Sequence, residues 1–133
     1  MLHHLDTGWQ HRRDPNVALF HYADLKADLA GELLRLARVL GIACSAERAR
    51  TLAAEASLAR MRERSADDAP NARRGTWKDV RAFFRSGGTG EWRERPAAAD
   101  LAAYEARVAA FVGPDLAAWV HGGRLASGVD PER

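Results

Sequence analysis

Apolar side chains recur every three or four positions through much of this 133-residue chain, which is the spacing of amphipathic helices. The clearest run is a set of leucines that would share one helix face: Leu29, Leu33, Leu36 and Leu40. Gly41 follows them at the position of a helix C-cap glycine. Ser45 is a suitable N-cap for a second helix that reaches Met61. The first half of the chain therefore predicts two helices.

Beyond Pro96 the same spacing predicts two more helices. The longer one carries large apolar residues and ends at Gly113, and the shorter one stops at Gly122 and Gly123. Residues 65–76 are rich in turn formers and predict a polar connection. Residues 125–133 are expected to be frayed.

One short segment breaks the helical pattern. Residues 17–22 read VALFHY, an almost wholly apolar run typical of a strand buried on both faces of a parallel sheet. No second convincing strand follows, and each backbone group left buried without a partner costs about 1 to 3 kcal/mol. Three explanations are open. Part of a larger α/β domain is absent from the chain, the strand pairs with another molecule, or the strand prediction is wrong.

Composition and charge exclude several classes of protein. The formal net charge of +2 is too small for a nucleic-acid-binding face. The excess of alanine and arginine is typical of GC-rich bacterial genes, so a single arginine is weak evidence of a site. The one cysteine, Cys44, excludes an internal disulfide. There is neither a long apolar run nor a signal-peptide pattern, and we expect a cytoplasmic protein without a membrane span.

Residues 83–92 read FFRSGGTGEW and place three glycines close to Arg85. Successive backbone N–H groups in such a turn can converge on an anion, and an arginine adds a planar fork that suits phosphate oxygens. The spacing fits neither a Walker A loop nor the dinucleotide fingerprint. On spacing alone, an ordinary glycine-rich turn held by the flanking aromatic residues is the more common explanation.

Two motifs together resemble those of PAPS-dependent sulfotransferases. The segment from residue 14, DPNVALFHYADLKADLAGELLRLARVLGI, is similar to their strand ending in Tyr-Glu-Asp-Leu, followed by a lysine and a helix closing on Leu-Gly-Ile. FFRSGGTGEW resembles their Arg-Lys-Gly-x-x-Gly-Asp-Trp element. The resemblance covers residues 10–124 and only the second half of the family's domain. It implies an α/β fold, the carboxy-terminal part of a P-loop-like sulfotransferase domain, mostly helical with one parallel-type strand and forming a single partial domain over 1–133.

The resemblance also implies a nucleotide site. Arg85 and Gly87 would hold the 3′-phosphate of PAPS or of its product, adenosine 3′,5′-bisphosphate. Ser86 stands where the family usually has a lysine, which removes one cation from the pocket. Tyr22 aligns with a tyrosine near the adenine, and Ser57 retains the serine of a Thr-Ser-Phe contact region.

Two parts of the family's reaction centre have no counterpart in these 133 residues: the phosphosulfate loop and the histidine base. Sulfuryl transfer needs both a cradle for the moving group and a proton acceptor, so we assign no catalytic residue. Two functions stay open. One is sulfuryl transfer from PAPS to an unknown hydroxyl acceptor when the amino-terminal half is supplied. The other is a non-catalytic nucleotide-binding or protein-interaction module. In either case we expect self-association or pairing with the missing half.

Other candidate sites have simpler explanations. His3, His4 and His11 lack the cysteine or carboxylate spacing of a metal site, and we predict no metal. We expect His21, inside the apolar run, to be satisfied by backbone groups. Residues 87–90 match the G-x-x-G of a KH loop, but the three strands of a KH domain are missing from the pattern.

Overall fold

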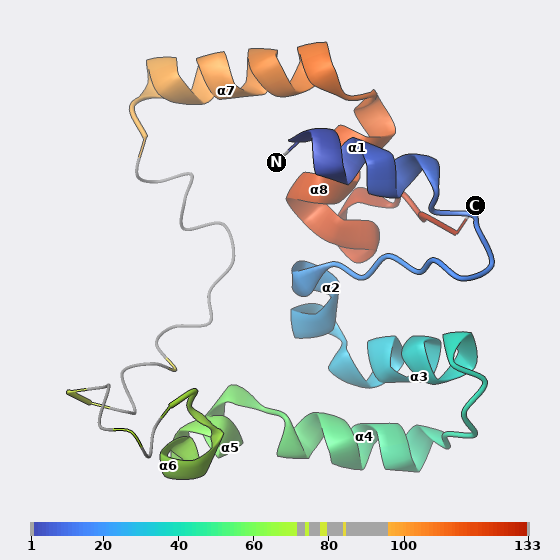
Figure 1. Cartoon of the computed structure of the whole chain (residues 1–133), viewed down its shortest axis with the longest axis vertical. Coiled ribbons are helices and arrows are strands. Elements are labelled where there is room, and N and C mark those ends of the chain that lie inside the picture. Colours follow the sequence, from blue (N-terminus) through green and yellow to red (C-terminus); the bar gives the residue numbers. More distant parts are fainter. Residues whose placement is uncertain (1, 72–73, 75–77, 80–83, 85–95, 133) are drawn as a thin grey trace. The chain divides into compact units, whose positions relative to one another are not determined.

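The computed structural model describes residues 2–71, 74, 78–79, 84 and 96–132. The elements in this part of the chain are all helices, and Figure 1 labels them in chain order. Their bounds are α1 Leu2–Gln10, α2 Tyr22–Ala27, α3 Leu29–Val39, α4 Ala46–Glu55, α5 Leu58–Glu63, α6 Ser65–Asp68, α7 Ala98–Phe111 and α8 Pro114–Ser127. Residues 1–32 and 90–133 form one compact unit, and residues 33–89 form a second.

The predicted strand at 17–22 is not present. Residues 17–21 are irregular, and Tyr22 already belongs to α2. The Val17 N–H donates to the Asp14 carbonyl oxygen at 2.9 Å, which is the bond of a turn. A strand is stabilised by the hydrogen-bonded ladder that it shares with a neighbour, and the described residues contain no strand to provide one. The described chain is therefore helical, and the prediction of a parallel-type strand is wrong for it.

The two caps predicted around residues 41–45 are confirmed. Gly41 has a φ of +67°, and Ile42 donates its N–H to the Ala37 carbonyl oxygen at 2.8 Å, which closes α3 in a Schellman motif. Ser45 accepts a hydrogen bond from the Arg48 N–H at 3.1 Å and begins α4. Residue type alone was enough here, because both motifs are local.

The single helix predicted from Ser45 to Met61 is wrong, because the chain forms two helices. α4 ends at Glu55, and Ser57 adopts an extended conformation with ψ of 150°. Its hydroxyl oxygen accepts the Arg60 N–H at 3.3 Å and so caps α5. A serine that bonds the backbone two or three residues ahead offers an alternative to continuing the helix.

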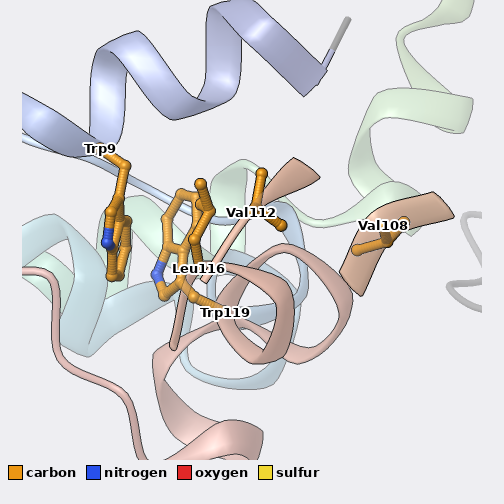
Figure 2. Packing of buried hydrophobic residues seen from close by; sticks show 5 residues of the cluster. All are labelled: Trp9, Val108, Val112, Leu116 and Trp119. Atoms are coloured by element: carbon orange, nitrogen blue, oxygen red, sulfur yellow. The ribbon is translucent and has the colours of Figure 1, made fainter. Parts of the chain in front are cut away.

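The apolar core belongs to the first unit and joins three helices. Trp9 of α1 faces Trp119 of α8 with ring centroids 5.5 Å apart, and Figure 2 shows Leu116 and Val112 beside them. Val108 adds α7 to the cluster, and Leu19 of the irregular segment packs against it. Such aromatic burial dominates the energetics of a small core. The core therefore fixes α8 in place.

α8 differs in part from the helix predicted to stop at Gly122 and Gly123. Its helical course is interrupted at Gly123, where φ is 74° and ψ is −179°, and one more turn follows to Ser127. In the segment expected to be frayed, Pro131 is buried and Val129 packs against the core.

The second unit buries small or polar side chains. The buried positions among its described residues are Arg35, Ala49, Ser65 and Ala69. Several large apolar side chains near the end of α3 and in α4 are exposed instead: Leu36, Val39, Leu40, Ile42 and Leu52. Within the described ranges, no helix is both long and apolar enough to cross a membrane.

Candidate nucleotide-binding site

The structure describes two of the five residues predicted to bind nucleotide. Tyr22 lies in the first unit and Ser57 in the second. Arg85, Ser86 and Gly87 lie outside the described residues. The joint site of the five residues stays a prediction.

Tyr22 is the first residue of α2, and 57% of its surface is exposed. An exposed aromatic ring on a fixed backbone is suited to stacking against a flat base. His21, the residue before it, and Asp24, two residues after it, contact α8. The ring of Tyr22 is therefore open to solvent while its backbone is held on both sides.

His21 caps α2 through its ring. Its Nδ1 accepts the Ala23 N–H at 3.1 Å, so Nε2 carries the proton and donates to the Val120 carbonyl oxygen at 3.0 Å. The ring also meets Trp119 edge-on, with centroids 5.3 Å apart. The prediction that backbone groups satisfy His21 is confirmed, although no sheet is involved.

Asp24 is buried, with 3% of its surface exposed. Its Oδ2 accepts the Arg124 N–H at 2.7 Å and its Oδ1 accepts the Leu125 N–H at 2.8 Å. These two N–H groups begin the last turn of α8 and have no helical acceptor behind them because of the break at Gly123. A buried carboxylate is stable only when it is bonded in this way.

Gly123 makes the contact with Asp24 geometrically feasible. A Cβ added at Gly123 would lie 2.6 Å from Asp24 Oδ1. Its combination of positive φ and extended ψ is also open to glycine almost alone. Both the close approach and the backbone angles therefore require glycine.

A second buried carboxylate, Glu32 of α3, pairs with Arg124. Glu32 Oε1 accepts a hydrogen bond from Arg124 Nη2 at 2.7 Å. This hydrogen bond is the largest cause that raises the pKa of the Arg124 guanidinium above its usual value; burial opposes it, and the negative charges of Glu32 and Asp24 add to it. Arg124 therefore joins α8 to α2 through its backbone and to α3 through its side chain.

Ser57 is half-buried, and its hydroxyl oxygen is engaged as the α5 cap. That contact uses an oxygen lone pair. The hydroxyl hydrogen is chemically able to donate to a phosphate oxygen at the same time. The capping role is thus compatible with the predicted nucleotide contact.

A groove of about 320 Å³ lies between α7 and α8. Its lining is Glu105, Val108, Ala109, Val112, Pro114, Ala117 and His121. His121 Nδ1 donates to the Ala117 carbonyl oxygen at 2.7 Å, and the Tyr104 hydroxyl donates to Nε2 at 3.1 Å. Tyr22 is not among the described residues that line this groove. In the described ranges no three potential metal ligands gather.

Sequence reasoning missed the contact between α2 and α8. Asp24 belongs to the Tyr-Ala-Asp-Leu motif, which by itself indicates no partner, and Arg124 lies beyond Gly122 and Gly123, a glycine pair that predicts the end of a helix. The available signals were one acidic residue next to an apolar run and a glycine pair followed by an arginine. Neither signal identifies the residue that it contacts, because Asp24 and Arg124 lie about one hundred positions apart in the chain.

A family model described as sulfotransferase domain matches residues 1–106. The chain belongs to the sulfotransferase domain family. The match includes Tyr22, Ser57 and FFRSGGTGEW, so the resemblance that located the predicted site is confirmed at the level of the family.

Curated relatives extend the likeness beyond residue 106. A glycolipid sulfotransferase of Mycobacterium bovis (strain BCG / Pasteur 1173P2) is 53% identical over 131 residues, which cover 98% of this chain and 39% of the relative. Glycolipid sulfotransferases of Mycobacterium tuberculosis strains H37Ra and H37Rv are each 52% identical over 98% of this chain and 40% of their own length. The chain therefore spans about two fifths of the relatives it matches. No solved structure matches the chain.

Proposed function

We propose that this chain supplies the adenine and 3′-phosphate part of the nucleotide site in a PAPS-dependent sulfotransferase. The observation that carries the proposal is the family match, which contains both nucleotide motifs in one chain. Family membership implies PAPS as the sulfuryl donor of its homologues. The exposed ring of Tyr22 supports the proposal, because it is free to stack on a base.

Each proposed contact follows from side-chain chemistry. The Arg85 guanidinium would bind two phosphate oxygens at once, and the backbone at Gly87 would approach them closely because it has no Cβ. Ser57 would donate its hydroxyl hydrogen to the same phosphate. Ser86 contributes at most a neutral hydrogen bond where the family usually has a cation.

The proposed acceptor is a glycolipid hydroxyl. This proposal rests on the curated relatives, which are named glycolipid sulfotransferases and match 98% of this chain at 52–53% identity. In the reaction, the acceptor oxygen forms a bond to sulfur while the bond between sulfur and the bridging phosphate oxygen breaks. The hydroxyl proton passes to a base, and adenosine 3′,5′-bisphosphate leaves.

We propose that the base and the phosphosulfate loop are provided by a segment equivalent to the part of the relatives that this chain does not match. That part makes up about three fifths of each relative. His21, the histidine next to Tyr22 in the sequence, is not suited to be the base, because both of its ring nitrogens are bonded to the backbone. The chain alone should accordingly bind nucleotide without transferring sulfate.

Radiolabelled PAPS and a mycobacterial glycolipid test the proposal. The 133-residue chain is compared alone and after joining to the segment of the Mycobacterium tuberculosis relative outside the match. We expect transfer by the joined protein and background transfer by the chain alone. Transfer by the chain alone that Arg85→Ala abolishes would contradict the proposed division of the site. A joined protein that binds adenosine 3′,5′-bisphosphate but never transfers sulfate would support the non-catalytic nucleotide-binding function instead.

A further inference from the structure

Tyr22 is anchored to α8 on both sides. The residue before it, His21, donates from Nε2 to the Val120 carbonyl oxygen. Two residues after it, Asp24 accepts the backbone N–H groups of Arg124 and Leu125. The Val120 carbonyl lies before the break of α8 at Gly123, and the two N–H groups lie after it.

α2 needs these anchors because it is short. It has six residues, and a helix of that length is unstable in water without tertiary contacts. Its one buried side chain is Asp24, so a carboxylate and not an apolar stripe docks this helix. The direction in which Tyr22 projects therefore depends on contacts with α8.

α8 lies wholly beyond residue 106, where the match to the sulfotransferase domain model ends. The match to the glycolipid sulfotransferases covers 131 of the 133 residues and so includes at least most of α8. The anchoring of a nucleotide-motif residue is thus provided by a part of the chain that the general family model does not describe.

We infer that Asp24, together with the backbone at Gly123 and Arg124, is a latch that positions Tyr22 for stacking on the adenine. The inference rests on the proposed function and adds a positioning residue to it. Asp24 does not touch the nucleotide. Its buried carboxylate fixes the backbone of α2, and the backbone fixes the ring.

Asp24→Asn tests the latch because it keeps the size of the side chain and replaces one acceptor oxygen by a donor, which faces an N–H group. The joined protein is titrated with adenosine 3′,5′-bisphosphate and with a ribose bisphosphate that lacks the base. Since an aromatic stack is a large part of base affinity, we expect Asp24→Asn to weaken nucleotide binding about five- to tenfold and to leave the base-free ligand within about twofold.

Tyr22→Ala provides the decisive comparison. If Asp24 acts through Tyr22, adding Asp24→Asn to Tyr22→Ala changes nucleotide affinity by less than about twofold. The control is Asp28→Asn, because Asp28 is exposed and its carboxylate caps the Gly31 N–H in the same segment. Asp28→Asn should leave unchanged the ratio of the affinity for adenosine 3′,5′-bisphosphate to the affinity for the base-free ligand.

Circular dichroism and amide spectra check that each variant folds. If Asp24→Asn unfolds the protein, Glu32→Gln is used in its place, since it loosens Arg124 while leaving the Asp24 carboxylate intact.

Two results would overturn the latch: an equal loss of affinity for the nucleotide and for the base-free ligand, or a double variant in which the two losses of nucleotide affinity multiply. Failure of the unmodified protein to bind either ligand would overturn the proposed function, and with it the inference. If the unmodified protein binds the nucleotide but Asp24→Asn acts independently of Tyr22→Ala, the inference is overturned and the proposed function is not.

Discussion

Arg124 donates a hydrogen bond from Nη2 to Oε1 of Glu32 at 2.7 Å, although 92 positions separate the two residues in the chain. The side chain of Glu32 is 1% exposed, and that of Arg124 is 31% exposed. The carboxylate has therefore left water almost completely, which is tolerated because a cation replaces the lost hydration. The pair ties the last turn of α8 to the first turn of α3 within the first unit.

Glu32→Gln should destabilise the protein. It keeps the shape of the side chain and leaves the Arg124 guanidinium without its buried partner charge, so we expect the free energy of unfolding to fall by about 1 to 3 kcal/mol. Urea unfolding followed by circular dichroism measures the change. Glu105→Gln, at an exposed position of α7, is the control and should change stability by less than about 0.5 kcal/mol. Equal effects of the two variants would show that the pair contributes nothing.

The contribution of Arg124 should not vary around neutral pH. Its pKa is raised in the folded protein, chiefly by the hydrogen bond with Glu32. A raised pKa of a basic group gives stability that is fully present below the unfolded pKa and is lost only as pH rises through the folded one. For arginine, the pKa of the unfolded state and the pKa of the folded state both lie far above neutral pH. The stability difference that Arg124→Leu causes should therefore be the same at slightly acidic and slightly alkaline pH.

Gly123→Ala should destabilise the protein, whereas the neighbouring substitution Gly122→Ala should not. At Gly123 a Cβ would lie 2.6 Å from Asp24 Oδ1, and the backbone conformation itself costs a non-glycine residue about 1 to 3 kcal/mol. At Gly122 the same atom meets only ordinary contacts, so alanine should be neutral or stabilise the helix by up to about 1 kcal/mol. Thermal unfolding of the two variants compares them. A Gly123→Ala variant as stable as Gly122→Ala would refute the described contact with Asp24.

The chain alone should self-associate. Leu40 and Ile42 are 59% and 58% exposed at the end of α3, next to other exposed apolar side chains of the second unit. Apolar surface of this kind is normally covered by protein. Sedimentation velocity should show species that grow with concentration, and Leu40→Lys with Ile42→Lys should reduce them. A compact monomer with a cooperative melt above about 60 °C would contradict the prediction.

Sequence predicted the elements whose causes are local. The C-cap at Gly41 and the N-cap at Ser45 each depend on residues within five positions, so pattern and residue type suffice. The break at Ser57 was missed because apolar spacing continues across it, while the extended backbone of that serine starts a new helix. The spacing of apolar residues does not reveal such an N-cap when the flanking residues are good helix formers.

The strand at 17–22 failed for a different reason. A run such as VALFHY is compatible with a strand only where a partner strand exists, and the described residues provide none. The hydrogen bond between Asp24 and Arg124 could not be predicted from the sequence either, since neither residue type nor spacing identifies a partner one hundred positions away. For the site itself, the resemblance located five residues, and the structure describes Tyr22 and Ser57 of these.

Nucleotide binding by Arg85→Ala tests the central claim most directly. The joined protein is titrated with adenosine 3′,5′-bisphosphate and with adenosine 5′-phosphate, which lacks the 3′-phosphate, and Arg50→Ala on exposed α4 controls for the loss of one positive charge. The account predicts that the unmodified protein prefers the bisphosphate. It also predicts that Arg85→Ala weakens bisphosphate binding by about ten- to a hundredfold, as expected for one charge-assisted hydrogen bond of about 1.5 to 3 kcal/mol, whereas Arg50→Ala does not. Equal affinity for the two nucleotides, unchanged by Arg85→Ala, would show that the glycines of FFRSGGTGEW form an ordinary turn and not a phosphate site.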